Sequence, residues 1–339
     1  MVFGAGKTAL DFLSKIQDQS NIFDDIIVGV IDNDMKKSGN YICGYLVSNV
    51  KKLSVLSFDL IVVASSGIEE ISLQLKERFS IVSEKIISDK DYRRKKISEY
   101  QFKRNYAKKL EISSNACSGF SRDSVVVYTA IIGDYDDLHN PEYVNPNWKY
   151  ICFTDNKYLK SDIWDVCYVK NEDKLDTPSF VRKFKICPHK FFSEFNTSIW
   201  MDANLCIKKD LAILMENYQR YADILFFPHP ERICVYDEGA ACVFWKRDNK
   251  KKILTQLKRY LEDEYPYDNG LLYGGFIIRN HNKIDVTETM EMWWHEVLNE
   301  SKRDQISLPY VLWKTKLPYD LVDLNYVNNE WFHFFAHKA

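Results

Sequence analysis

Two side chains with oxygen ligands, Asp202 and Asn204, follow an apolar run from Thr197 to Met201. The run predicts a buried strand, and residues two apart on an extended chain point to the same side. Carboxylate and amide oxygens suit hard cations such as Mg²⁺ or Mn²⁺. Such an ion would neutralise the charge that develops on a leaving diphosphate. The pattern predicts a metal site at the strand end, with a plain turn as the alternative.

Three basic or imidazole side chains, Arg182, Lys185 and His189, follow a helix start signal at Thr177–Pro178. Their i, i+3, i+7 spacing places them along one side of a helix. There they would present positive charge to a diphosphate. A solvated helix face is the alternative, and Pro188 favours a helix end next to His189.

Candidate acid–base residues occur in two places. Asp304 and Gln305 stand at a predicted helix start, where Asp304 would act as general base in an inverting enzyme or orient the sugar in a retaining one. A helix N-cap is the other interpretation of Asp304. Residues 229–232 and 236–239 follow another strand and predict an active-site loop for the acceptor, with Glu238 as a catalytic candidate. An ordinary loop is the alternative there.

A glycine pair and a histidine surround a later strand. Gly274 and Gly275 would let the donor or acceptor sugar approach the backbone closely. His281 comes just after this strand, where it is either a further metal ligand or a surface histidine.

A second nucleotide site is suggested near the start of the chain. Gly4 and Gly6 follow a strand at residues 1–3 and precede a helix at residues 9–16, and Asp32 closes the second strand. This arrangement is typical of NAD(P) or nucleotide binding, with the acid on the ribose. A tight strand-to-helix turn without a ligand is the alternative.

The elements that must position these residues divide into two α/β regions. We predict a Rossmann-like parallel sheet domain at residues 1–95, a charged helical linker at 96–121 and a second α/β domain at 122–339, because strands alternate with helices on both sides of the linker. In the first region a strand is expected at residues 26–31. In the second region, strands are expected at residues 124–130, 150–153, 198–201, 224–227 and 276–279, with helices at 179–185 and 211–221.

The composition restricts the partners and the cellular location that we expect for this chain. The 339 residues are 46% hydrophobic and carry a formal net charge of -2, so nucleic acid is not an expected partner. Apolar runs are too short to span a bilayer and no signal peptide is visible, so we expect a cytoplasmic protein. The scattered cysteines lack Cys-x-x-Cys pairs and predict reduced thiols. The aromatic stretch 331–335 packs on the domain or, alternatively, contacts a partner or the inner face of a membrane.

Several motifs in a shared order carry a resemblance to a known family. Over about residues 124–325 the chain resembles the glycosyltransferase-like family of bacterial polysaccharide loci and of plant Golgi proteins in pectin and mucilage synthesis. Residues 28–34 and 44–47 resemble the small Rossmann-like domain fused to bacterial polysaccharide enzymes. The motifs of the first resemblance are Val126–Asp136, Tyr150–Asp155, Lys185–His189, Trp200–Asn204, Gly274–Arg279, Trp293–Glu296 and Arg303–Ser307.

The resemblance implies a GT-A-like fold with an Asp-x-Asp-like metal site. Asn204 departs from this pattern, because its amide oxygen contributes no negative charge. The first strand and its loop would hold the nucleotide in such folds. The implied donor-binding residues are Thr129, Ala130, Gly133 and Tyr135 by the base and ribose, and Asp155 near the uracil or ribose.

We therefore expect a metal-assisted glycosyltransferase that moves a hexose-like unit from a UDP- or GDP-sugar to a surface glycan or glycolipid. Two alternatives are an NAD-dependent sugar-nucleotide oxidoreductase and a non-catalytic sugar-nucleotide-binding protein. The donor, the acceptor, the stereochemistry and the oligomeric state stay open.

Overall fold

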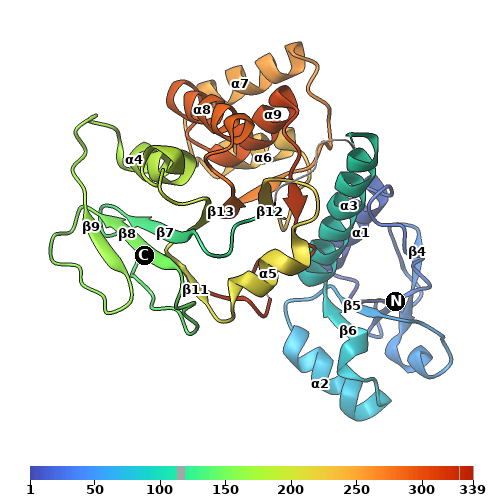
Figure 1. The fold of residues 1–339 in the computed structure, drawn as a ribbon. Coiled ribbons are helices and arrows are strands. Elements are labelled where there is room, and N and C mark those ends of the chain that lie inside the picture. Colours follow the sequence, from blue (N-terminus) through green and yellow to red (C-terminus); the bar gives the residue numbers. More distant parts are fainter. Residues whose placement is uncertain (113–118, 328, 339) are drawn as a thin grey trace. The chain divides into compact units, whose positions relative to one another are not determined.

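The computed structural model describes residues 1–112, 119–327 and 329–338. The chain forms two compact units, Met1–Tyr100 and Gln101–Ala339 (Figure 1). Their division falls inside the predicted linker of residues 96–121, where helix α3 (Asp89–Ile112) runs from one unit into the other. Residues 113–118 of that linker lie outside the described part of the chain.

The first unit is a Rossmann-like sheet of strand order β3-β4-β2-β1-β5-β6. All neighbouring strands are parallel except β3 and β4, which form a hairpin. The second strand is shorter than the expected span 26–31, because its partner β1 offers only two residues and Ile26 is exposed. The elements are β1 (Val2–Phe3), α1 (Lys7–Asp18), β2 (Val30–Asp32), β3 (Tyr41–Ile42), β4 (Tyr45–Asn49), β5 (Ile61–Val63), α2 (Ile68–Phe79) and β6 (Ile86–Ser88), with short 3-10 turns at Val50–Ser54 and Ser83–Lys85.

The second unit contains a mixed sheet of order β14-β12-β13-β10-β7-β8-β9, and the predicted α/β class is confirmed for both units. Strand β13 runs antiparallel to both of its neighbours, whereas β10, β7, β8 and β9 are parallel. The sheet strands are β7 (Val125–Ile131), β8 (Lys149–Thr154), β9 (Asp165–Tyr168), β10 (Thr197–Met201), β12 (Ile224–Pro228), β13 (Leu272–Arg279) and β14 (Asp320–Leu321).

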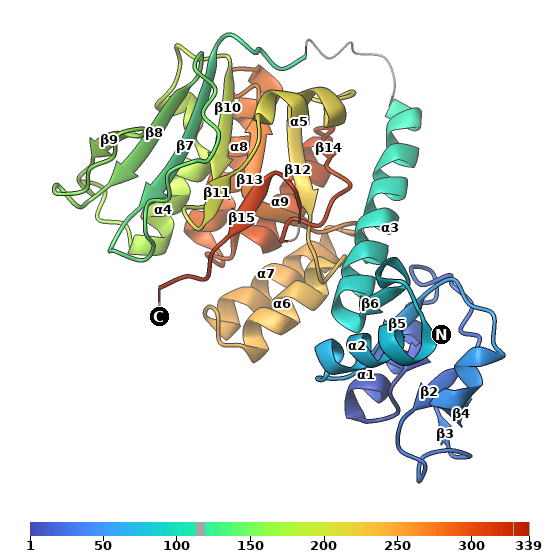
Figure 2. The same cartoon turned by 90° about the horizontal axis from the view of Figure 1, so that it is seen from below.

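Helices and a small second sheet cover the two faces of this sheet (Figure 2). Alternating residues of the strands separate into two cores, because successive side chains on a strand point to opposite faces. Tyr128, Trp200 and Ile277 face one helical layer, and Val127 and Ile199 face the other side. The first layer holds α4 (Thr177–Ile186), α6 (Val235–Phe244), α7 (Lys250–Glu262), α8 (Ile284–Asn299) and α9 (Asp304–Thr315), with a 3-10 turn at Pro188–Lys190; the other holds α5 (Leu211–Tyr218), β11 (Leu205–Ile207) and β15 (Phe332–Phe334).

The C-terminal aromatic stretch packs on the second unit, as the first of its two interpretations predicts. Strand β15 pairs antiparallel with β11, and Trp331 and Phe332 are buried. Among the described residues, no helix combines the length and apolarity that a membrane span requires. The described cysteines are free thiols, and Cys117 lies outside the described residues.

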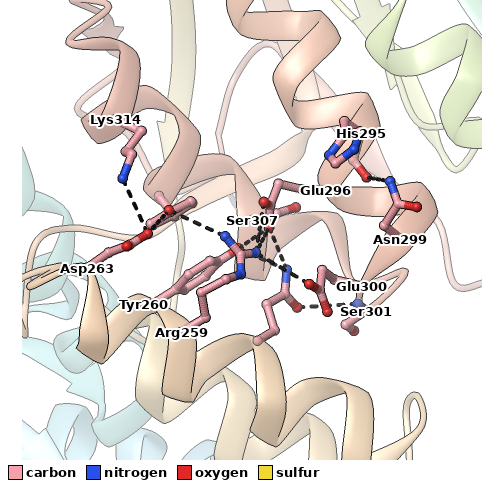
Figure 3. Close-up of polar contacts among 12 residues, drawn as sticks. Arg259, Tyr260, Asp263, His295, Glu296, Asn299, Glu300, Ser301, Ser307 and Lys314 are labelled. Carbon is pink, nitrogen blue, oxygen red and sulfur yellow. Dashed lines mark hydrogen bonds and ion pairs between the residues drawn. The ribbon is translucent and has the colours of Figure 1, made fainter.

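A partly buried charge network ties α7 to α8 (Figure 3). The Arg259 guanidinium donates to both carboxylate oxygens of Glu296, at 2.8 and 2.6 Å. The hydroxyl of Tyr260 donates to the same carboxylate at 2.9 Å. The ring of Tyr260 in turn stacks on Tyr310 of α9 at 3.8 Å between centroids. The network therefore fixes the helix that carries Asp304 at its first position.

Replacing Glu296 by glutamine is expected to lower the free energy of unfolding by about 1.5 kcal/mol, the lower end of the range for a charged hydrogen bond. The low end applies because Arg259 keeps 35% of its side chain exposed. Urea unfolding measures the change. Glu288→Gln, on an exposed position of the same helix, is the matched control and should leave stability unchanged.

Candidate active site

A cleft of about 580 Å³ opens in the second unit where β7 and β10 end. The beginnings of α4 and α9 and the C-terminal segment form its other walls. The ends of neighbouring parallel strands meet at one sheet edge, which is where α/β folds commonly bind ligands. The lining of the cleft includes Gly133, Tyr135, Asp136, Arg182, Lys185, Asp202, Asn204, Arg247, Tyr273, Gly275, Arg303, Asp304, Gln305, Tyr326 and His337.

Asp202 is held rigidly at the floor of this cleft. Its backbone N–H donates to the carbonyl of Gly275 at 2.8 Å, which continues the β10–β13 ladder by one residue. Its Oδ1 accepts from the Trp200 indole N–H at 2.9 Å. Trp200 is buried and therefore has a fixed position. Its bond to Oδ1 orients the Asp202 carboxylate and leaves Oδ2 available. Asp202 therefore presents one carboxylate oxygen in a set orientation.

Asn204 lies beside it with an amide oxygen that needs a partner. The side chain is 1% exposed, and its Oδ1 has no hydrogen bond among the described residues. Its Nδ2 donates to the carbonyl of Phe335 at 3.2 Å, and the Phe335 N–H donates to the Asn204 carbonyl at 2.8 Å. A buried acceptor without a donor costs free energy unless a cation or ligand donor satisfies it.

His337 reaches the same cleft from the C-terminal segment. Its Nδ1 lies 2.9 Å from Oδ1 of Asp136, and a carboxylate can only accept, so Nδ1 carries the proton. In the neutral ring, Nε2 then accepts from Nδ2 of Asn204 at 3.5 Å. This carboxylate–histidine arrangement is typical of metal sites, where the acid fixes the ligating tautomer.

Positive charge lines the opposite wall around Asp304. The Lys185 ammonium hydrogen-bonds to Oδ2 of Asp304, and Nε of Arg182 lies 3.3 Å from Oδ1. Burial alone would raise the pKa of Asp304, but the charges of Lys185, Arg182 and Arg303 outweigh it and hold the pKa well below its usual range. The cluster carries three cations for one carboxylate, and Arg247 adds a fourth cation to the lining.

Local sequence fixes the helix that carries two of these cations. Asp176 caps α4 by accepting from the Ser179 N–H at 3.1 Å, and Pro178 stands in its first turn. At the other end, the buried Arg279 guanidinium donates to the carbonyl of Lys185 and to the Tyr128 hydroxyl. A cation at a helix C-terminus is favourable for the helix dipole. The backbone of Lys185 is therefore anchored to the sheet.

The two glycines of β13 leave space for different side chains. A Cβ at Gly274 would lie 2.9 Å from the Lys185 ammonium, so its absence makes room for the Lys185–Asp304 pair. Gly274 is not among the residues that line the cleft, which corrects its predicted contact with a sugar. Gly275 does line the cleft, and a Cβ there would collide with the Tyr273 ring at 2.2 Å. That ring stacks on Tyr326 at 3.5 Å between centroids.

Of the predicted nucleotide-binding residues, Ala130, Gly133 and Tyr135 line the cleft. Asp155 does not, because its carboxylate accepts from the Gly133 N–H at 3.1 and 3.2 Å and so positions that turn. Thr129 is buried behind the lining at 1% exposure. Arg182, Lys185, Asp202, Asn204, Asp304 and Gln305 are brought together as the sequence predicts.

Three predicted site residues lie elsewhere. His281 is fully buried and Nε2 lies 2.8 Å from the Phe192 carbonyl, so it does not join Asp202. His189 contacts Glu291 at 2.7 Å, because the helix ends at Ile186 before it can continue along the cleft face. Glu238 is a buried residue of α6, where it accepts from Nε of Arg232 at 2.6 Å. We drop all three from the proposed site.

The N-terminal candidate residues form a turn whose acid is already engaged. Oδ2 of Asp32 accepts from the Ala5 N–H at 2.7 Å and from the Lys37 ammonium at 3.0 Å. Gly4 has φ +115°, and a Cβ there would lie 2.7 Å from the Ala64 carbonyl oxygen. The geometry of the fold thus accounts for Gly4 and Asp32 without a nucleotide, and Gly6 precedes α1 with open space around it.

Comparison with known families finds a match for each part of the chain. Residues 100–338, well over half of the chain, match the TOD1/MUCI70 glycosyltransferase-like domain. The chain belongs to the TOD1/MUCI70 glycosyltransferase-like family. Residues 1–87 match a second family, the C2185-like N-terminal domain. No curated protein matches the chain.

In this TOD1/MUCI70 chain the cleft is also lined by four residues that were not predicted from the sequence, namely Asp136, Arg247, Arg303 and His337. His337 lies two residues beyond the aromatic stretch that drew attention as a packing element. A histidine just beyond this aromatic stretch was the available signal. Arg303 precedes Asp304 directly, and the motif that contains it also indicated the cleft.

Proposed function

We propose that this chain transfers a glycosyl group from a nucleoside diphosphate sugar to a hydroxyl of a glycan or glycolipid, assisted by Mn²⁺ or Mg²⁺. Its membership of a glycosyltransferase-like family supports a transferase of this general type. The observation that carries the proposal is a single cleft with metal-type ligands on one wall and cations on the other. The cations would face the negative charge of the donor diphosphate, and the metal-type ligands would hold its divalent counter-ion.

The ligand set fits a divalent cation. Asp202 offers a carboxylate oxygen, Asn204 an unsatisfied amide oxygen and His337 an imidazole nitrogen with its proton fixed on the far side. Carboxylate and amide oxygens are ligands that suit Mn²⁺ and Mg²⁺. When bound, the ion would neutralise the departing diphosphate. His337 thus takes the ligand role that His281 was expected to fill.

The cations assist the same step from the other side. In the reaction, the bond from sugar C1 to the diphosphate oxygen breaks and a bond from C1 to the acceptor oxygen forms. The nucleoside diphosphate leaves with the bonding electron pair, and the acceptor proton passes to water. Arg182 and Lys185 stabilise that leaving charge. Asp304 holds both cations in place.

Asp304 is poorly suited to the predicted role of general base. A base works best when its pKa lies near the operating pH, and the pKa of Asp304 is held far below that. Both its oxygens also face cations, at Arg182 and Lys185. We therefore assign Asp304 as a positioning residue, with Gln305 beside it at the cleft wall.

Donor turnover tests the proposed function. The chain is mixed with UDP- and GDP-sugars, with Mn²⁺ or with a chelator, and release of the nucleoside diphosphate is followed. We expect release that depends on the metal and on one of the two nucleotides. Absence of nucleotide binding with metal present would overturn the proposal.

Removing the imidazole in His337→Ala is expected to weaken Mn²⁺ binding by on the order of 100-fold, because the site loses a nitrogen ligand. Titration calorimetry with Mn²⁺ measures the affinity. His333→Ala is the matched control, since His333 belongs to the same segment but pairs with Glu142 at 2.8 Å. Equal affinities in both variants would exclude His337 as a ligand.

A further inference from the structure

The connection between α6 and α7 exposes a basic aromatic turn, which we define as residues 244–251. Figure 2 shows these two helices side by side, joined at one end by this connection. Phe244 and Trp245 are 74% and 66% exposed, and their rings contact each other edge to face at 4.9 Å. Four cations accompany them, at Lys246, Arg247, Lys250 and Lys251.

The turn carries four cations and one acidic residue, so its net charge is positive. Asp248 is its acidic residue, but Oδ2 accepts from the Ser301 hydroxyl at 2.8 Å and the Lys302 N–H at 2.7 Å. Lys250 and Lys251 stand in the first turn of α7, where the helix dipole disfavours cations. Exposed cations at this position, beside two exposed aromatic rings, would be stabilised by contact with an anionic surface.

The turn is continuous with the cleft. Arg247 belongs to the turn and also lines the cleft, whereas its aromatic and lysine neighbours lie outside the lining. Whatever covers the turn is therefore held at the mouth of the proposed transferase site. Leu254 and Leu261 of α7 are also exposed, at 48% and 46%, which extends the apolar character along the helix.

We propose that the basic aromatic turn docks the chain on a bilayer with anionic headgroups, so that the cleft meets a membrane-borne acceptor; the acceptor part of this statement rests on the proposed function. Aromatic rings favour the bilayer interface, and lysines extend flexible stems to headgroups. The set contains three lysines and one arginine. Specific carboxylate recognition on a glycan favours the forked guanidinium instead. The exposed leucines of α7 likewise suit a lipid surface.

Vesicle flotation with the full chain tests the proposal. The vesicles are phosphatidylcholine alone or mixed with phosphatidylglycerol. We expect binding to the mixed vesicles only, weakened by salt. Lys246→Gln/Lys250→Gln/Lys251→Gln should lower the partition coefficient by on the order of 100-fold, roughly fivefold for each lysine. Phe244→Ser/Trp245→Ser should lower it by roughly tenfold. Circular dichroism and thermal melting check that both variants are folded.

The matched control removes three exposed lysines elsewhere in the unit, at Lys160, Lys170 and Lys174, and should bind like the unaltered chain. Equal loss in the control, or no flotation of the unaltered chain, would overturn the proposal. Lysine-dependent binding to soluble polygalacturonate in place of vesicles would overturn it in favour of an anionic glycan. Donor turnover is measured separately, so docking without turnover would count against the proposed function alone.

Discussion

Asp202→Asn is expected to lower metal-dependent donor turnover by on the order of 1000-fold, because the proposed metal site would lose its fixed anionic ligand. The amide can still accept from the Trp200 indole N–H, so the fold should be preserved. What disappears is the negative charge that attracts the ion. Release of nucleoside diphosphate at saturating donor and varied Mn²⁺ measures the effect.

The pattern of that loss distinguishes the metal role from a packing role. If Asp202 binds the ion, raising the Mn²⁺ concentration should recover part of the turnover. Asp162→Asn, on an exposed position of the same unit, is the control and should behave like the unaltered chain. Full activity of Asp202→Asn at low Mn²⁺ would remove this residue from the site.

Asp304→Asn is expected to destabilise the second unit by about 3 kcal/mol or more at neutral pH, because it leaves buried cations without their anion. The carboxylate is 5% exposed and faces both Lys185 and Arg182. Urea unfolding measures the loss. The double variant Lys185→Met/Asp304→Asn should lose less unfolding free energy than the two single variants do in sum. In the double variant, Lys185 no longer leaves a buried cation that lacks its carboxylate partner.

The contribution of Asp304 to the unfolding free energy should also depend on pH. Since the pKa of Asp304 is lower in the folded chain than its ordinary value of 3.8, its stabilising contribution is present in full above that value. This contribution is lost as the pH falls through the lower pKa that Asp304 has in the folded chain. The difference in unfolding free energy between the unaltered chain and Asp304→Asn should therefore shrink on acidification. A difference that is constant with pH would contradict the charge pairing.

Elements with a strong periodic pattern were predictable from the sequence. The apolar runs that became β7, β10 and β12 are continuous and buried on both faces, so each expected span overlaps the observed strand. Short pieces such as β11 and β15 were not found, because three residues are too few to show a period. Their pairing depends on a contact between residues 205–207 and 332–334 that no local pattern reveals.

The site was predictable where its residues follow strand ends or begin helices. Asp202 and Asp304 belong to that class, and both line the cleft. His281 was misplaced because a strand end locates the backbone but not the face on which the next side chain lies. Gly274 was misinterpreted for a similar reason, since the space that it leaves is filled by Lys185 from another element. Such long-range contacts decide between solvent, ligand and packing.

The lateness of His337 in the chain has a consequence for biosynthesis. Ribosomes deliver the chain from its N-terminus, at about 5–20 residues per second, and domains fold as they emerge. Asp136 and Asn204 are made long before the histidine that contacts them. The sheet that bears them can thus assemble while the proposed metal site still lacks a ligand. Full affinity for the proposed ion would then appear only after residue 337 has been added, so a shorter growing chain would hold the metal less tightly.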